Sequence, residues 1–446
     1  MLIRFNVENF LSFRDEVEFS MIAGSERRLP DHYIKHKDFN ILKGAVIYGP
    51  NASGKSNLVK AIHFAQQFIL NGFDGVESLN KHFRLDPEVA KKPTRFEFEI
   101  KAGKTLYSYG FTLQLEKQVV HEEFLYRIEK NRNYLIFERD TGLQDKIQVK
   151  YGLKASNNDF ARFEIYAKDL KHDQLLLQQV NTRNLEEVES AVHFIDVFQW
   201  FKYSLVIIYP DSRYKGLTFP KTNKKFTEIL SKFLKSMDTG ITKALFTEVD
   251  IEEELGTLRD TDRKKILNDL RKKTIKFLQI KKVSYAIWLD DSGKLRGKKL
   301  VLVHTDKQGK QVLFDCNEES DGTNRLMDLI PALDILSTLE RVFVVDELDR
   351  SLHPHLSEAF IKLFFKQSRD IPNQLIVTTH ESSLQNLRLL RRDEIWFIER
   401  QADGHSELYS LNEFKVRPDK ELRKDYLIGR YGAIPSIELL ETSRLN

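Results

Sequence analysis

Near the N-terminus, eight consecutive residues have the types and spacing of a phosphate-binding loop. They match G-x-x-x-x-G-K-[ST] at every fixed position and read Gly49-Pro50-Asn51-Ala52-Ser53-Gly54-Lys55-Ser56. In such a loop the backbone N–H groups and the positive end of the following helix surround a β-phosphate. Lys55 then reaches the β- and γ-phosphates, and the Ser56 hydroxyl is a ligand of Mg²⁺. The segment, extended by Asn57, therefore predicts a site for ATP and Mg²⁺.

Two adjacent acids, Asp346 and Glu347, follow an apolar run that is typical of a buried strand. Beside a phosphate loop, an acid in the position of Asp346 holds Mg²⁺, partly through water. Glu347, one residue further on, would polarise the attacking water as a general base. Alone, such a pair could simply cap the next helix. With the phosphate loop in the same chain, we expect the pair to serve hydrolysis of the nucleotide.

Two further segments could contact a γ-phosphate. Ser320 and Gly322 precede a helical pattern at 325–339, where the N-terminus of a helix can bind an anion; a plain helix cap is the alternative. His380 stands directly after an apolar run at 375–379 and is the candidate for a histidine that senses the γ-phosphate.

Strands and helices have to position these groups. An apolar run at 45–48 precedes the phosphate loop and a helical pattern at 55–70 follows it, so the loop joins a strand to a helix. The runs before Asp346 and His380 predict two more buried strands. From residue 320 to 398 strands and helices alternate, as a parallel sheet requires.

In other stretches the apolar residues recur with a different spacing. Strands are predicted at 3–7 and 17–19, and period-two alternation over 96–137 predicts an antiparallel meander. Residues 220–282 are charged and helical in pattern. Three further strands are predicted, at 283–289, 300–304 and 311–314.

Composition limits the class of protein. Hydrophobic residues are 41% and charged residues 30% of the 446 residues, as in a globular protein, and the net charge of +4 neither demands nor excludes nucleic acid. Cys316 is the only cysteine, which fits a reducing compartment. There is no apolar stretch of the roughly 18 residues needed to cross a bilayer. We therefore expect a cytoplasmic protein without membrane contact.

Four segments carry a resemblance to ABC-type ATPases related to the SMC and RecF proteins: 9–13, 49–57, 346–354 and 426–435. Most of the chain separates Lys55 from Asp346, and proteins of this class carry such an insertion between the halves of the nucleotide-binding sheet. Ser320 and Gly322 resemble the ABC signature, although Asp321 and Thr323 depart from its usual L-S-G-G-Q form. Residues 348–354 resemble the D-loop and His380 the switch histidine. The resemblance also implies a glutamine that contacts the metal, for which Gln178 and Gln179 are candidates.

The resemblance implies an α/β fold: an ABC-type P-loop head with a mixed sheet, an antiparallel β subdomain, a helical insertion and no long coiled coil. The N-terminal lobe would be 1–180 and a mainly helical insertion or lid 181–310. The C-terminal lobe, 311–446, would hold the signature, the acidic pair, the D-loop and the histidine.

The same four segments look like bacterial AAA family ATPases of AbiL- and Rlo-type abortive-infection systems and, more distantly, of the PARIS and Septu systems. The implied function is an ATP-hydrolysing regulatory or sensor subunit of an anti-phage defence system. It would form dimers or larger assemblies around ATP, with the signature of one copy completing the site of another. Too little sequence follows His380 for the Toprim nuclease domain of the OLD proteins, so the implied effector is a separate Toprim-like or RloB-like nuclease.

Two other functions stay open at this point. A RecF-like DNA-maintenance ATPase would use the basic stretch 263–282 and the turn 294–299 against phosphates, although a solvated helix face explains the same charges. The ATPase subunit of a transporter would not need so large a meander and insertion.

Overall fold

The chain folds into two units, each assembled from separate stretches of sequence. The computed structural model describes residues 1–76, 80–130, 132–142, 146–185, 188–211, 224–256, 258–272, 276–280, 283–290, 292–333, 340–415 and 422–435. The first unit contains Met1–Tyr209, Ile335–Asp349 and Ile361–Asn446, and the second contains Pro210–Asp334 and Arg350–Phe360. Both ends of the chain therefore belong to the same unit.

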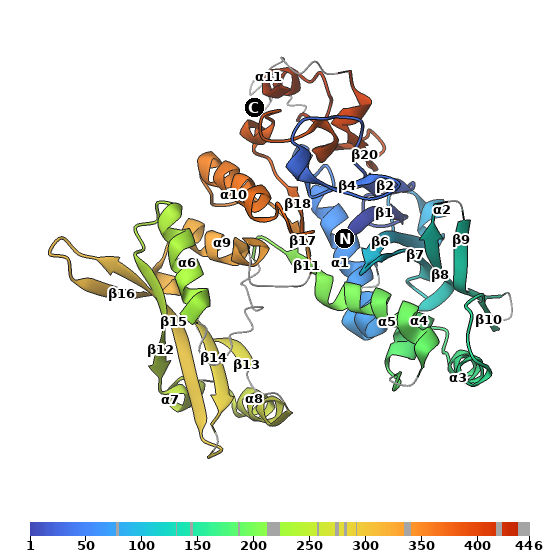
Figure 1. Ribbon diagram of the computed structural model, residues 1–446, viewed down its shortest axis with the longest axis horizontal. Helices are drawn as coiled ribbons and strands as arrows, with labels where there is room; N and C mark the ends of the chain where they lie inside the picture. The colour runs from blue at the N-terminus through green and yellow to red at the C-terminus, as the bar shows by residue number, and fades with distance from the viewer. Residues whose placement is uncertain are drawn as a thin grey trace, which may run out of the picture. The chain divides into compact units, whose positions relative to one another are not determined.

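A six-stranded sheet forms the centre of the first unit (Figure 1). In spatial order its strands are β11 (Leu205–Ile208), β17 (Val342–Val345), β18 (Gln374–Thr378), β5 (Gly44–Tyr48), β19 (Ile395–Arg400) and β20 (Ser406–Ser410). All neighbours are parallel except β19 and β20. Every residue of β5, β17 and β18 is buried, which explains why these strands read as unbroken apolar runs.

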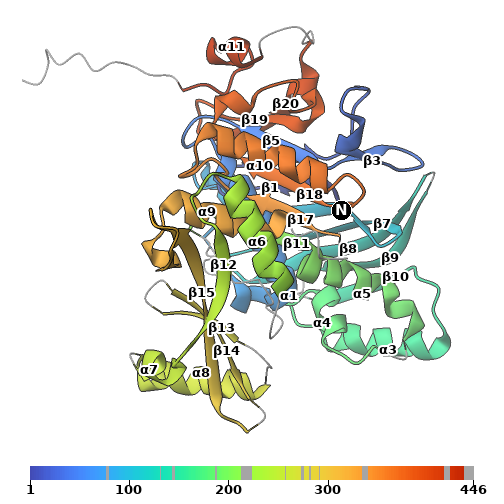
Figure 2. The ribbon, with the colours of Figure 1, turned by 60° about the vertical axis from the view of Figure 1, so that its left-hand side comes forward.

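A seven-stranded antiparallel sheet is the second layer of the first unit (Figure 2). Its spatial order is β10 (Ile147–Tyr151), β9 (Arg132–Thr141), β8 (Val119–Glu129), β7 (Thr105–Gln114), β6 (Thr94–Ala102), β1 (Leu2–Glu8) and β2 (Val17–Ser20). Burial alternates strictly along β6, because one face of the sheet packs on the core and the other faces outward. The predicted meander is confirmed.

Helix α1 (Lys55–Asn71) packs in the core that the two sheets share. Its Phe64 ring lies 5.1 Å from that of Phe10 and 5.6 Å from that of Phe96, measured between centroids. Ile47 of β5 and Val344 of β17 belong to the same core. The helix that begins at the phosphate loop is therefore held from both sides by apolar contacts.

Smaller elements complete the first unit. They are β3 (Tyr33–Lys35), β4 (Asn40–Leu42), α2 (Pro87–Ala90), α3 (Asn157–Lys168), α4 (Leu176–Asn181), α5 (Val192–Gln199) and α11 (Leu422–Leu427). After α11 the chain turns back through Gly429 and Gly432, both with positive φ, and the Tyr426 hydroxyl donates to the carbonyl of Ala433. Because the Tyr426 ring stacks on Phe397, this tail is anchored on β19.

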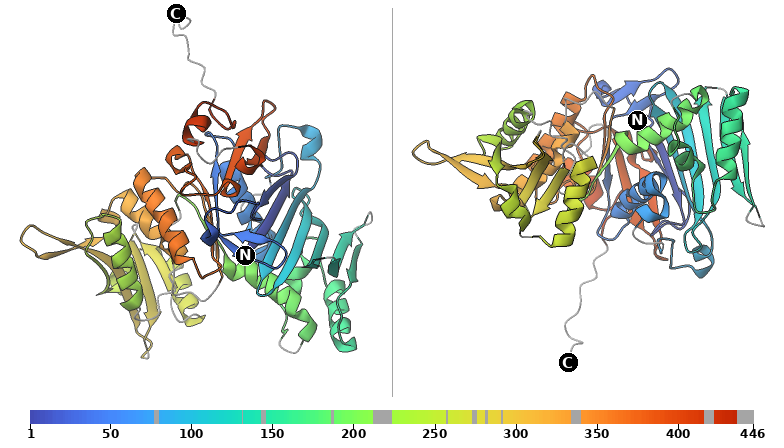
Figure 3. Two further views of the ribbon diagram at one scale, coloured as in Figure 1. Left: turned by 45° about the horizontal axis from the view of Figure 1, so that its top comes forward. Right: turned by 90° about the horizontal axis from the view of Figure 1, so that it is seen from below.

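The second unit is built on another antiparallel sheet (Figure 3). Its strands are β12 (Lys243–Val249), β13 (Lys276–Ile280), β14 (Val283–Leu289), β15 (Leu295–Thr305) and β16 (Gln311–Asp315). Its helices are α6 (Lys224–Ser236), α7 (Ile251–Gly256), α8 (Asp260–Lys272) and α9 (Asp321–Leu329). Helix α10 (Pro354–Gln367) begins in this unit and ends in the first.

Strands interrupt the segment over 181–310, for which a mainly helical structure was expected. The strands β12 and β13 lie among the helices, and β12 pairs with β15 in the register Lys243↔Val303. A strand whose partner is so remote in sequence has little local signal, since pairing and burial rather than propensity decide it.

Among the described residues no helix combines the length and the apolar character needed to span a bilayer. The longest described helix is α1, with 17 residues, so the described part of the chain has no long coiled coil.

Candidate functional site

The phosphate loop joins β5 to α1, as predicted, and its two glycines allow close packing. A Cβ atom on Gly49 would clash with the carbonyl of Ile398, and one on Gly54 would lie 2.8 Å from the Ser12 hydroxyl. Gly54 also has φ of 112°, which a side chain rarely tolerates. Side chains at these two positions would therefore force the loop out of shape.

Two serines from other elements hold the outside of the loop. The buried Ser406 hydroxyl at the start of β20 donates to the carbonyl of Ser53 at 2.6 Å. The Ser406 amide donates to the carbonyl of Ser12 at 2.7 Å, and the Asn57 side chain donates to the Ser12 hydroxyl at 2.8 Å. Ser12 belongs to a segment that the resemblance had singled out, whereas nothing in the sequence pointed to Ser406.

Lys55 is buried and bonded to its own loop. Its Nζ donates to the carbonyls of Gly49 at 2.7 Å and Pro50 at 2.9 Å. Burial lowers the pKa of Lys55 to about 8, against the opposing effect of nearby carboxylates, chiefly Asp346. A phosphate anion in the loop would favour the charged form of the amine.

Ser56 and Asp346 form the candidate magnesium pair. The Ser56 hydroxyl donates to Asp346 Oδ1 at 3.2 Å, and Asp346 is buried at the end of β17. Neighbouring ligands of an octahedral Mg²⁺ with bonds of about 2.1 Å lie about 3 Å apart. The two oxygens therefore fit two adjacent positions around one Mg²⁺.

Glu347 has an unusual backbone conformation. Its φ is 48°, in the left-handed region, which costs a residue with a Cβ roughly 1–2 kcal/mol. Its amide donates to the Thr378 hydroxyl at 2.8 Å, and the same hydroxyl donates to Asp346 Oδ1 at 2.6 Å. The contact with β18 thus fixes the backbone of the candidate general base.

His380 follows β18 and approaches the phosphate loop. Its Nδ1 lies 3.5 Å from Lys55 Nζ, and its amide donates to Asp349 Oδ1 at 3.3 Å. The Thr379 hydroxyl donates to the same oxygen at 2.7 Å. Partial burial of the ring and then the charge of Lys55 lower the pKa of His380, which favours the neutral ring.

Five predicted residues therefore meet at the carboxyl edge of β5, β17 and β18, namely Lys55, Ser56, Asp346, Glu347 and His380. Gln178 does not join them. Its side chain lies 3.4 Å from the position of a Cβ on Gly72, at the opposite end of α1. Gln179 belongs to the same short helix, α4.

The signature residues lie in the second unit. Ser320 caps α9, since its hydroxyl accepts from the amide of Thr323 at 3.1 Å. A Cβ on Gly322 would lie 2.7 Å from the carbonyl of Ser351, which accounts for the glycine. Ser320 and Asp321 are exposed, so the N-terminus of α9 faces solvent within its unit. The helix begins at residue 321, earlier than the pattern at 325–339 indicates, and 334–339 lie outside the described residues.

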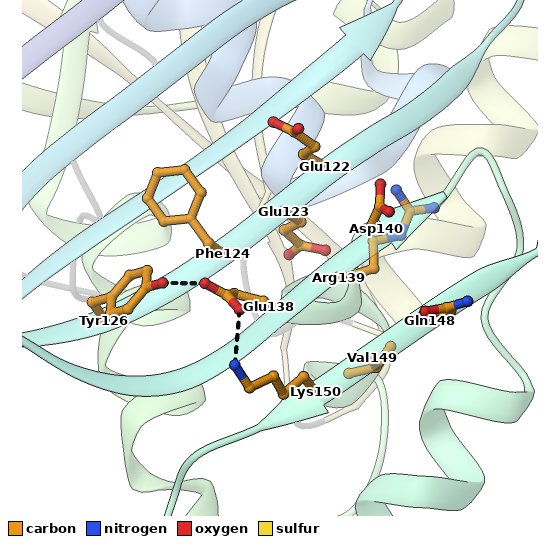
Figure 4. A pocket seen from close by; sticks show the side chains of 10 residues that line it. All are labelled: Glu122, Glu123, Phe124, Tyr126, Glu138, Arg139, Asp140, Gln148, Val149 and Lys150. Atoms are coloured by element: carbon orange, nitrogen blue, oxygen red, sulfur yellow. Dashed lines mark hydrogen bonds and ion pairs between the residues drawn. The ribbon is translucent and has the colours of Figure 1, made fainter. Parts of the chain in front are cut away.

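A surface depression of about 540 Å³ lies elsewhere, on β8, β9 and β10 (Figure 4). Glu138 in its wall accepts from the Tyr126 hydroxyl and pairs with Lys150 at 3.7 Å. The depression contains none of the predicted site residues.

Comparison with known proteins identifies a family. No curated protein matches the chain. Among solved structures, the "SMC head domain from Thermotoga maritima" aligns at 13% identity and TM-score 0.36, over 93% of this chain and 99% of that one. The "Crystal structure of the SmcHead bound to the C-winged helix domain of ScpA" aligns at 13% identity and TM-score 0.37, over 92% and 97%.

The structure has the predicted α/β architecture, with the phosphate loop at the edge of a mixed sheet and with an antiparallel β subdomain. Residues 45–385 match a family of P-loop domains and include the phosphate loop, the acidic pair and His380. The chain therefore belongs to the AAA_21 family, described as "AAA domain, putative AbiEii toxin, Type IV TA system".

Proposed function

We propose that this chain is an ATPase that cleaves the bond between the β- and γ-phosphates of ATP with water. The observation that carries the proposal is the 3.2 Å approach of the Ser56 and Asp346 oxygens beside Lys55. Lys55 neutralises the β- and γ-phosphate oxygens, and Ser56 and Asp346 hold Mg²⁺. When bound, the metal withdraws charge from the phosphate oxygens. Glu347 accepts the proton of the attacking water, and His380 donates a hydrogen bond to the γ-phosphate.

The wider role that we propose is that of a cytoplasmic sensor or regulatory subunit in anti-phage, abortive-infection defence. The family description, which names a toxin of a toxin–antitoxin system, supports a role of this kind. Two copies would enclose ATP head to tail, with Ser320 and Gly322 of one copy facing the γ-phosphate held by the other. The ATP-bound assembly would control a separate effector, a Toprim-like or RloB-like nuclease, as in the AbiL- and Rlo-type systems and the more distant PARIS and Septu systems.

Direct DNA binding of the RecF type is the less favoured candidate. Four basic side chains that it would use are paired within the chain: Arg263 with Glu252, Arg296 with Asp290, Lys298 with Glu248 and Lys299 with Asp315. Of the remaining basic run, Lys273, Lys281 and Lys282 lie outside the described residues. Pairing of this kind reduces the local positive potential that phosphate binding needs.

The test is a pull-down of the Glu347→Gln protein from its native host, read by mass spectrometry. This substitution keeps the shape of the side chain but removes the base, so ATP should bind and persist; phosphate release should fall by about 100-fold or more. A nuclease-like protein should be recovered with it and be lost in the Lys55→Ala control, which cannot hold the phosphates. Recovery of DNA and repair proteins instead would sink the defence role and favour the RecF-like alternative.

A further inference from the structure

Thr378, the last residue of β18, places its hydroxyl between the two acidic residues of the site. The side chain is 1% exposed. Its O–H donates to Asp346 Oδ1 at 2.6 Å, and its oxygen accepts from the Glu347 amide at 2.8 Å. A threonine hydroxyl has one proton to donate, and that proton is used on the carboxylate.

The backbone of Thr378 adds another hydrogen bond to the segment that follows β17. Its carbonyl accepts from the amide of Leu348 at 2.9 Å. One residue of β18 thus bonds three consecutive residues that follow β17: a side chain at 346 and the backbone at 347 and 348. The parallel pairing of β17 with β18, in the register Val345↔Val377, brings these groups together.

The Thr378 hydroxyl contacts both acidic residues of the site. Asp346 also accepts from Ser56, so two hydroxyls orient the carboxylate that we assign to Mg²⁺. Glu347 has φ of 48°, and its amide is held there by Thr378. We propose that Thr378 is a positioning residue that fixes both the metal-binding carboxylate and the general base, an inference that rests on the ATPase proposed above.

The neighbouring residue offers a matched control. Thr379 has the same side chain and is also buried, but its hydroxyl donates to Asp349 at 2.7 Å. Replacing either threonine by valine keeps the shape and removes one hydroxyl. A general loss of packing would affect both variants alike, whereas only the Thr378 substitution removes hydrogen bonds to Asp346 and Glu347.

The experiment compares Thr378→Val, Thr378→Ser and Thr379→Val in the full chain. Residues that orient metal ligands are typically worth about 10–100-fold in metal affinity or activity. We therefore expect Thr378→Val to lower kcat by about 10–100-fold and to raise by a similar factor the Mg²⁺ concentration at which ATP binding is half-maximal. KM for ATP at saturating Mg²⁺ should change by less than about threefold, because Lys55 and the loop backbone are untouched. Thr378→Ser keeps the hydroxyl and should restore both values.

Three results are informative. An unchanged kcat and Mg²⁺ midpoint in Thr378→Val, or an equal shift of the Mg²⁺ midpoint in Thr379→Val, would overturn the positioning role while leaving the ATPase intact. A wild-type protein that binds ATP but releases no phosphate would remove the proposed ATPase; the Mg²⁺ midpoint would still decide whether Thr378 orients Asp346. If Thr378→Val unfolds, as melting would show, Thr378→Ala provides the same comparison with a smaller side chain.

Discussion

At the scale of single residues, the burial of Lys55 makes the stability of the folded protein depend on pH. In the free protein, burial lowers the pKa of its amine to about 8. The folded state holds this proton less tightly than the unfolded state. Burial of the charged Lys55 amine therefore lowers the free energy of unfolding, and this loss is greatest below pH 8. It is relieved as the pH rises from about 8 towards 10.5.

ATP binding should show the opposite trend, because the phosphates need the charged amine. Above pH 8 we expect the Kd for ATP to rise by up to about tenfold per pH unit, with uptake of a proton on binding. Calorimetric titrations in two buffers of different ionisation enthalpy measure both effects. Lys55→Arg stays charged and should flatten the profile; an equally steep rise in that variant would assign the pH dependence to another group.

Sequence reasoning correctly placed those residues whose position depends on near neighbours. Lys55 and Ser56 lie in one loop, and Asp346 and His380 each end an apolar run, so motif and strand pattern sufficed. Thr378 and Ser406 could not be found in that way. Their contacts depend on which strands are neighbours and in which register, and that is decided by packing of the whole sheet.

At the scale of elements, the start of β20 supports the phosphate loop through Ser406. A hydrogen bond of this kind is worth about 1 kcal/mol, so Ser406→Ala should weaken ATP binding by about fivefold. Ser410 lies in the same strand, and its hydroxyl accepts from the amide of Asn412. Ser410→Ala should therefore leave the Kd for ATP unchanged. Equilibrium titration with ATP measures both, and equal effects of the two variants would contradict a specific role for Ser406.

Among the helices and strands, some elements could not be predicted from the sequence pattern. Residues 220–282 are densely charged, and α6 and α8 dominate their pattern, so β12 and β13 were not predicted. Gln178 was a candidate on residue type alone, yet α4 holds it near Gly72, where α1 ends. Long elements with a clear period, such as the meander and α1, were predicted close to their observed bounds.

At the scale of the whole molecule, the proposed head-to-tail assembly would depend on the exposed N-terminus of α9. Asp321 occupies its first turn and places a negative charge where the proposal puts the γ-phosphate of another copy. Asp321→Asn should therefore lower the ATP concentration needed for dimers of the Glu347→Gln protein by about threefold to tenfold, as light scattering would show.

The matched control is Asp262→Asn, which makes the same charge change in the first turn of α8. It should leave the dimerisation midpoint unchanged. If both substitutions shift the midpoint equally, the effect is one of net charge and the signature helix has no special place in the interface.

The order of strands in the six-stranded sheet also bears on how the chain is made. β5 lies between β18 and β19, which are synthesised some 330 residues later. At about 5–20 residues per second on the ribosome, β5 and the phosphate loop wait for tens of seconds before either neighbour exists. The seven-stranded sheet needs only residues 2–151 and can form meanwhile, giving α1 one apolar surface to rest on. Nucleotide binding is thus a property that the nascent chain acquires late, once its last strands have emerged.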